Sequence, residues 1–199
     1  MIAHDQYVCQ KNAMTLQGGI PGEDPWYAFS VKSRHEKKVE AGLTLRLFHA
    51  FLPLYACRRK WADRYQTVDL PLFPGYVFCN CATTSIGPIL NVPGVVDVVR
   101  AGRIPAPVSE DEMVALQHVV NSNLATDPWP SLVVGEKVSI TDGPLAGLSG
   151  SLVQIKAAWR LVVSVALLQR SVLVQIDRDW VTPYRPMNRF QVTAQLKRA

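Results

Sequence analysis

The pattern of apolar and polar positions changes its period several times before residue 121, as in a mixed α and β domain. Alternating apolar positions, the period of a β-strand, predict strands at residues 26–31, 51–55, 76–81 and 95–99. Apolar positions three or four residues apart predict helices at about residues 33–47, 84–90 and 109–120. The resulting order of strands and helices indicates an α+β domain.

The first predicted helix has a marked start and one apolar stripe. Ser33 is placed to act as its N-cap, and Glu36, three residues further on, completes a capping box. Val39, Leu43 and Leu47 follow at intervals of four residues, so they share one face of a helix that reaches about Leu47.

The central feature of the chain is the sequence FPGYVF at residues 73–78. Pro74 fixes its own φ, and Gly75 can adopt the positive φ that a type II turn requires. The turn leads into a strand on which Tyr76 and Phe78 share one side. Two interpretations remain open: a core strand with a lead-in turn, or an aromatic patch offered to a partner. They are compatible, because one face can pack inward while the turn faces outward.

The pattern changes after residue 121. Residues 121–132 are rich in Asn, Ser, Asp and Pro, which is the composition of a linker. Beyond residue 133 only short β runs follow, and strands are predicted at residues 138–140, 152–155, 161–168 and 172–176. The last two form a hairpin about residues 169–171. Strands this short can bury a core by curling into a small barrel.

Composition and charge narrow the class of protein. The 199 residues are 48% hydrophobic and 19% charged, which is typical of a globular chain. The formal net charge is +5, and residues 32–64 alone contain nine Lys or Arg against three Asp or Glu. This clustering favours contact with phosphates, and a solvated helix face is the alternative. The basic sequence RRKW at residues 58–61 is predicted to extend a strand or to form a hairpin.

Catalytic and metal-binding candidates are sparse. The cysteines are Cys9, Cys57, Cys79 and Cys81, with no second Cys/His pair at metal-ligand spacing, so small buried residues are expected. No histidine lies near a glycine-framed Ser or Cys, and no nucleotide-phosphate motif occurs. The sequence therefore predicts no enzyme, no metal site and no cofactor.

The N-terminus has no basic and apolar leader, and the longest apolar run covers only residues 161–168. A membrane-spanning helix needs about 20 apolar residues. We therefore expect a cytoplasmic protein with no membrane contact.

Two sets of motifs resemble those of one family. The pattern GxxVxIxDGPxxGxxG from Gly135 to Gly150 resembles the KOW motif of transcription and ribosomal proteins, whose glycines are expected at a positive φ or at close backbone approaches. Upstream, the sequences WY at 26–27, FPGYVF at 73–78, VPGV at 92–95 and PAPVS at 105–109 resemble the N-terminal (NGN) domain of NusG-type transcription elongation factors. The chain is therefore similar to the NusG family, and to its specialised paralogues of the RfaH/UpxY type.

This resemblance implies a division of the chain. Composition predicts a flexible extension at residues 1–24 and a basic tail at 185–199. Between them the resemblance implies a sandwich-like α/β NGN domain at 25–121, a linker at 122–132 and an SH3-like KOW β-barrel at 133–184. In one relative the second domain refolds as helices that mask the first. The alternating Val, Leu and Ile after residue 133 favour a barrel here.

The resemblance also implies a transcription elongation and antitermination factor without catalytic activity. Its first domain would bind the clamp helices of RNA polymerase and suppress pausing or termination. An apolar anchor in a concave spot provides most of the energy of such an interface. The positions that match the family's polymerase-binding patch are Tyr27, Ala28, Phe29, Phe73, Pro74, Tyr76 and Phe78.

Two further sites are implied in the same way. Specialised relatives read the non-template single strand of DNA, and the matching positions are Lys32, Ser33, Arg34, His35, Thr83 and Thr84. For the two threonines helix capping is the alternative. The family's barrel recruits ribosomal protein S10 or the termination factor Rho through a hairpin loop, which matches Leu167, Leu168, Gln169 and Arg170. A monomer is expected.

The main rival is a ribosome-associated or general RNA-binding KOW protein. It accounts for the barrel and the positive charge, but not for the patterns at residues 26–27 and 73–78.

Overall fold

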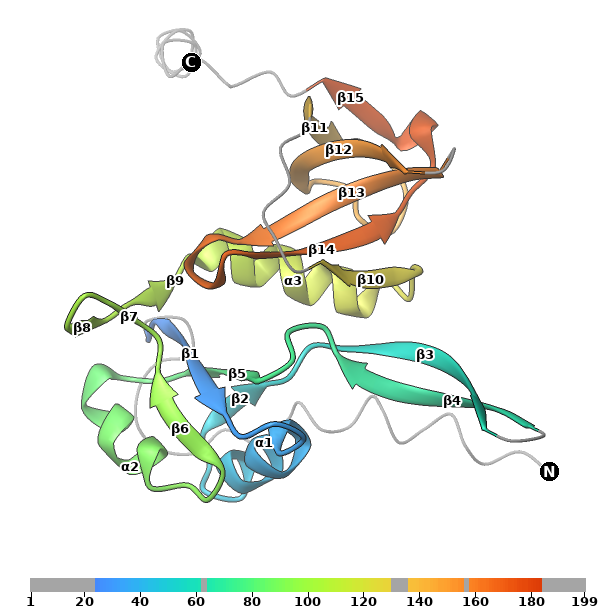
Figure 1. Cartoon of the computed structure of the whole chain (residues 1–199). Coiled ribbons are helices and arrows are strands. Elements are labelled where there is room, and N and C mark those ends of the chain that lie inside the picture. The colour runs from blue at the N-terminus through green and yellow to red at the C-terminus, as the bar shows by residue number, and fades with distance from the viewer. Residues whose placement is uncertain (1–23, 62–63, 130–135, 156–157, 184–199) are drawn as a thin grey trace, which may run out of the picture.

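The structure is a computed structural model that describes residues 24–61, 64–129, 136–155 and 158–183 (Figure 1). The predicted extension, except for its last residue, and the predicted basic tail lie outside the described residues, as does Gly135 of the KOW pattern. The described residues form an N-terminal sheet with three α-helices and a separate C-terminal sheet. The predicted fold class, α+β followed by a small all-β unit, is confirmed.

The N-terminal sheet is antiparallel. Its strands lie in the order β2 (His49–Phe51), β5 (Tyr76–Asn80), β1 (Trp26–Val31) and β6 (Val95–Val98), and the short β9 (Pro107–Val108) also pairs with β1. The central strands β1 and β5 therefore have neighbours on both sides over most of their length, as their almost continuous burial requires.

Helices cover both faces of this sheet, as expected for a sandwich. Helix α1 (Glu36–Thr44), the 3₁₀ turn η1 (Thr83–Ser85) and helix α2 (Ile86–Leu90) lie on the face that buries Tyr27 and Phe29. Helix α3 (Glu110–Asn121) lies on the other face, which buries Ala28 and Phe78. The alternation predicted for residues 26–31 and 76–78 thus separates two hydrophobic clusters.

The predicted capping box of the first helix is wrong. Ser33 makes no capping hydrogen bond, and the helix begins at Glu36. The Glu36 carboxylate instead accepts a hydrogen bond from the backbone N–H of Gly75, at 2.9 Å, and is 7% exposed. A partner 39 residues away in sequence has replaced the local cap.

The predicted end of this helix is also wrong. Helix α1 ends at Thr44, and Leu47 is 80% exposed rather than part of the apolar stripe. Leu47 has a φ of 64°, and the N–H of Phe48 donates to the carbonyl of Leu43 at 3.1 Å. This is the geometry of a Schellman motif, which stops a helix and turns the chain away from it.

A two-stranded hairpin projects from the N-terminal sheet (Figure 1). Strands β3 (Leu54–Trp61) and β4 (Arg64–Pro71) pair along their whole length, from Leu54 opposite Pro71 to Trp61 opposite Arg64. The basic RRKW sequence therefore belongs to a hairpin. A smaller hairpin joins β7 (Arg100–Ala101) to β8 (Ile104–Pro105).

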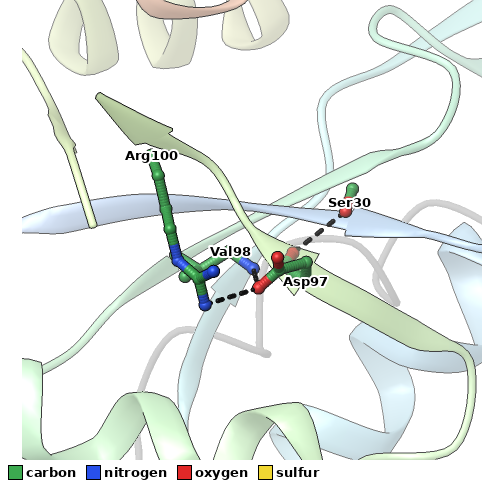
Figure 2. A network of polar contacts seen from close by, with 4 residues as sticks. All are labelled: Ser30, Asp97, Val98 and Arg100. Carbon is green, nitrogen blue, oxygen red and sulfur yellow. Dashed lines mark hydrogen bonds and ion pairs between the residues drawn. The ribbon is translucent and has the colours of Figure 1, made fainter. Parts of the chain in front are cut away.

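A polar network fastens β6 to β1 where their register shifts (Figure 2). The Ser30 hydroxyl donates to the Asp97 carbonyl oxygen at 3.0 Å. One carboxylate oxygen of Asp97 accepts from the Val98 N–H at 2.8 Å and from the Arg100 guanidinium at 2.9 Å. The Ser30 bond therefore links the two strands at the register shift, and the Asp97 carboxylate links β6 to Arg100 of β7.

The C-terminal sheet has six antiparallel strands. Their order is β10 (Thr126–Trp129), β14 (Arg170–Gln175), β13 (Ala158–Val165), β12 (Ser149–Ile155), β11 (Glu136–Ile140) and β15 (Val181–Pro183). The 3₁₀ turns η2 (Ala166–Leu168) and η3 (Arg178–Trp180) precede β14 and β15. Three glycines of the KOW pattern behave as predicted. Gly143 and Gly147 have φ values of 76° and 91°, and a Cβ on Gly150 would lie 2.8 Å from the carbonyl oxygen of Val162.

The segment predicted to be a linker contains a strand of the C-terminal sheet. Strand β10 follows α3 after four residues and pairs with β14 from Thr126 opposite Val174 onward. An ion pair of 3.0 Å between Asp127 and Arg160 of β13 fastens it further. Pro128 is compatible with this position, because β10 is an edge strand and needs fewer backbone donors.

Candidate functional site

The N-terminal and C-terminal parts of the chain are in contact through α3. This helix lies between the two sheets (Figure 1), and one hydrophobic cluster includes its Met113 and Leu116 together with Leu161 and Val163 of β13. Polar groups flank this apolar contact. They join the turn at residues 73–76 and helix α3 to residues 166–170, which we call the barrel loop.

The turn at residues 73–76 is held firmly. Gly75 has a φ of 85°, as predicted for the third position of a type II turn, and the Tyr76 N–H donates to the Phe73 carbonyl at 3.1 Å. The Gly75 N–H is bonded to Glu36, and its carbonyl accepts from the Val31 N–H at 2.9 Å. The backbone of this turn is therefore preorganised by α1 and β1.

Arg170 of the barrel loop contacts this turn directly. Its Nη1 donates to the carbonyl oxygen of Pro74 at 2.9 Å, and its guanidinium carbon lies 5.0 Å from the centre of the Tyr76 ring. The second contact is a cation–π interaction. Gln169, just before it, has a φ of 53° and completes the loop through a hydrogen bond of 3.0 Å from Nε2 to the Ala166 carbonyl.

Glu112 of α3 provides a second polar contact with the barrel loop. Its Oε1 accepts a hydrogen bond from the Ala166 N–H at 3.2 Å. Burial raises the pKa of the Glu112 carboxyl, and the Ala166 hydrogen bond opposes part of this rise. A cleft of about 350 Å³ remains beside this contact, lined by Asp111, Glu112 and Lys137 among others. The contact between the two parts is therefore not sealed along its whole length.

The predicted polymerase-binding residues are not equally accessible. Pro74 is exposed and Tyr76 is half-buried. Ala28, Phe73 and Phe78 are fully buried, and the rings of Phe73 and Phe78 pack edge to face at 5.7 Å. Tyr27 and Phe29 are buried on the opposite face of the sheet. Of the matching positions, Pro74 and Tyr76 are thus the two that reach the surface.

The predicted DNA-reading residues do not form one cluster. Lys32, Ser33 and Arg34 are exposed where β1 leads into α1, and Nδ1 of the half-buried His35 lies 3.0 Å from the Ser33 carbonyl. Thr83 and Thr84 are exposed, and the Thr83 hydroxyl lies 2.9 Å from the Tyr27 hydroxyl, near the start of β1. The length of β1, about 13–16 Å, separates the two groups.

The predicted partner residues of the barrel lie in the barrel loop. Leu168 is 8% exposed, Leu167 and Arg170 are half-buried, and Gln169 is exposed. The structure therefore brings two separately predicted surfaces, the turn and the barrel loop, against each other. Glu112 was missed as a contact residue, because its sequence context indicates only an acidic residue in the first turn of a helix.

Other site classes find little support in the described part of the chain. Among these residues no group of three His, Cys, Asp or Glu side chains is placed to hold a metal ion, and no helix is long and apolar enough to cross a membrane. Cys79 and Cys81 are buried side by side in the N-terminal part. Hydrogen bonding between the two thiols and burial raise the pKa of Cys79, so this thiol is a poor nucleophile.

Residues 24–117, from just before β1 into α3, match the family model described as "Transcription termination factor nusG". Residues 24–117 of this chain belong to the NusG family. The "Transcription termination/antitermination protein NusG" of Thermus thermophilus is 26% identical over 176 residues, which cover 76% of this chain and 94% of that protein. The NusG of Rickettsia prowazekii is 24% identical over 173 residues, covering 78% of this chain and 88% of that protein.

A solved structure described as "Domain interaction in Thermotoga maritima NusG" has the same fold. It is 21% identical, covers 82% of this chain and 98% of that chain, and gives a TM-score of 0.52. The KOW-like C-terminal sheet lies beyond the residues that the NusG family model matches.

Proposed function

We propose that this NusG-family protein is a transcription elongation and antitermination factor. Its N-terminal part binds the clamp helices of RNA polymerase and suppresses pausing or termination, and its C-terminal barrel recruits ribosomal protein S10 or Rho. The observation that carries the proposal is the family match over residues 24–117, which contain the whole N-terminal sheet. A transcription factor of this type performs no catalysis itself.

The polymerase contact is proposed to centre on the turn at residues 73–76. Pro74 and Tyr76 present an apolar ring and a half-buried aromatic ring with a polar tip, on a backbone fixed by Glu36 and Gly75. A rigid aromatic anchor loses little conformational entropy when it binds, which favours a role as a hot spot. The buried Phe73 and Phe78 then support the turn from below instead of touching the partner.

The contact between the turn and the barrel loop adds a condition to this function. Arg170 donates a hydrogen bond to the Pro74 carbonyl oxygen and covers one side of the Tyr76 ring. A partner that covers the turn therefore competes with the barrel loop, and a partner of the barrel loop competes with the turn. In this proposal each partner promotes binding of the other by separating the two parts. Exposed Lys32, Ser33 and Arg34 remain free to approach the non-template DNA strand in either arrangement.

The test is capture of purified core RNA polymerase by the full chain. Tyr76→Ala should weaken binding about tenfold or more, the range for loss of an aromatic hot spot. Tyr65→Ala is the matched control, because Tyr65 is an exposed tyrosine on the β3–β4 hairpin. Equal capture by wild type and Tyr76→Ala would refute the proposed contact. Binding to structured RNA that outcompetes polymerase would instead support a general RNA-binding protein.

A further inference from the structure

The outer half of the β3–β4 hairpin is a surface to which neither the family match nor the proposed polymerase contact gives a role. The two strands pair with each other and with no other strand of the described chain. Residues 58–60 and 64–67 are exposed throughout, and we call them the basic ribbon. At about 3.3 Å per residue, a hairpin arm of eight residues extends about 26 Å from its base.

Four cations crowd this short surface: Arg58, Arg59, Lys60 and Arg64. The ion pairs found among the described residues lie elsewhere, so no carboxylate in that part of the chain neutralises any of the four. Asp63 is the one acidic residue of the sequence between positions 55 and 68. A concentration of unpaired positive charge at the end of a projecting arm favours an anionic partner.

The cations are divided between the two faces of the basic ribbon. Opposed residues share a face, and Lys60 lies opposite Tyr65, so Arg58, Lys60 and Tyr65 lie on one face. Arg59 alternates to the other face, where Arg64 also lies because it opposes Trp61. Each face therefore carries two cations. All four can contact phosphates if the basic ribbon lies between two anionic walls, whereas a partner that contacts one face would reach only two.

We propose that the basic ribbon inserts into the major groove of double-stranded DNA and contacts phosphates on both sides of the groove. A major groove about 12 Å wide admits a two-stranded β-ribbon, and its walls are phosphate backbones. Three of the four cations are arginines, whose planar guanidinium matches phosphate oxygens in a bidentate way. The exposed Gln66 and Thr67 add neutral hydrogen-bonding groups between the charges.

Duplex DNA fits this surface better than single-stranded DNA does. Single-strand binding combines cations with free aromatic rings on which bases stack. Here the guanidinium of Arg58 lies 4.4 Å from the centre of the Tyr65 ring and covers one side of it. Duplex RNA fits poorly as well, because the major groove of an A-form helix is deep and narrow. The proposal is independent of the polymerase contact, since it involves a different surface and a different partner.

The experiment measures binding of the full chain to a fluorescent 25-base-pair DNA duplex by anisotropy, in 50 to 200 mM salt. The variant Arg59→Gln/Arg64→Gln removes both cations from one face. Each lost phosphate contact reduces the slope of log affinity against log salt by about 0.9, so the slope should fall by about 1.8. Over this fourfold range of salt, the loss of affinity should be about tenfold smaller than in the wild type.

The matched control is Lys37→Gln/Lys38→Gln, which removes the same charge from exposed positions on α1. It should leave the slope nearly unchanged, and thermal unfolding should show that both variants are folded. The same assay is repeated with three comparison ligands: one strand of the DNA duplex alone, duplex RNA and poly-glutamate. Each should bind more weakly than the DNA duplex. Absence of duplex binding, equal losses in the two variants, or tighter binding to any comparison ligand would overturn the proposal.

Discussion

Replacing Arg170 with alanine should separate the barrel loop from the turn at residues 73–76 without unfolding either part. The substitution removes the 2.9 Å hydrogen bond to Pro74 and the cation–π contact with Tyr76. At a partly exposed site the hydrogen bond contributes about 1 kcal/mol, and the cation–π contact contributes about 0.5–1 kcal/mol. Their sum of about 1.5–2 kcal/mol corresponds to an increase of about 10- to 30-fold in the ratio of separated to joined molecules.

Hydrogen exchange measured by NMR reports this ratio. The Ala166 N–H is bonded across the contact to Glu112, so its exchange rate should rise by the same 10- to 30-fold. The Gly75 N–H, bonded to Glu36 within the N-terminal part, should keep its rate. Arg100→Ala is the matched control, because Arg100 is an exposed arginine whose ion pair lies within the N-terminal part.

The same variant should bind polymerase more tightly if the joined form predominates in the free protein. The apparent affinity of a partner falls by the fraction of molecules that can accept it, so releasing the barrel loop should increase affinity by up to the same factor. Unchanged exchange at Ala166 would refute the assigned energies. Faster exchange with unchanged polymerase affinity would refute the competition between the two partners.

Three other predictions concern the stability of the N-terminal part and of helix α3. Gly94→Ala should destabilise the protein more than Gly75→Ala, because both have a positive φ but only at Gly94 would a Cβ come within 2.9 Å of Val39; similar denaturation midpoints would contradict this. Glu36→Ala should lower the free energy of unfolding by about 1–3 kcal/mol, since the Gly75 N–H loses its acceptor; urea titration tests this, and Glu36→Gln should lose less because its side-chain carbonyl can still accept. The pKa of Glu112 is raised in the folded protein, so the folded state binds the Glu112 proton more tightly than the unfolded state does. The contribution of Glu112 to the free energy of unfolding should therefore increase as the pH falls through the raised pKa towards the ordinary value of 4.5. Glu112→Gln should abolish that part of the pH dependence of stability, and equal pH profiles for wild type and variant would count against it.

Local chemistry allowed much of this fold to be predicted. The alternation at residues 26–31 and 76–78 correctly separated the two faces of the N-terminal sheet, because the period of a strand is fixed by its backbone. The turn at Gly75 and the constrained glycine at Gly143 followed from conformations that glycine adopts readily.

The errors and omissions share a different cause. Glu36 satisfies all the local conditions of a capping box, yet its partner is 39 residues away. Leu47 continues the four-residue period, yet it takes a left-handed conformation that ends the helix. Arg170 and Pro74 are 96 residues apart, and no local pattern at either position indicates the other. The candidate site consists of such long-range contacts, which depend on how the two sheets pack.

Strand β10 also determines how far the barrel can travel once it is released. While β10 stays paired with β14, only residues 122–125 are available as a tether, and four extended residues span about 14 Å. If β10 detaches, the tether gains at least the four residues of β10, and the eight residues from 122 to 129 alone span about 28 Å. A longer tether lowers the effective concentration of the barrel at the turn of residues 73–76, and it enlarges the volume that the barrel can reach. Peeling of this edge strand, which is held by its pairing with β14 and by the Asp127–Arg160 ion pair, would therefore lengthen the tether and extend the range of the barrel.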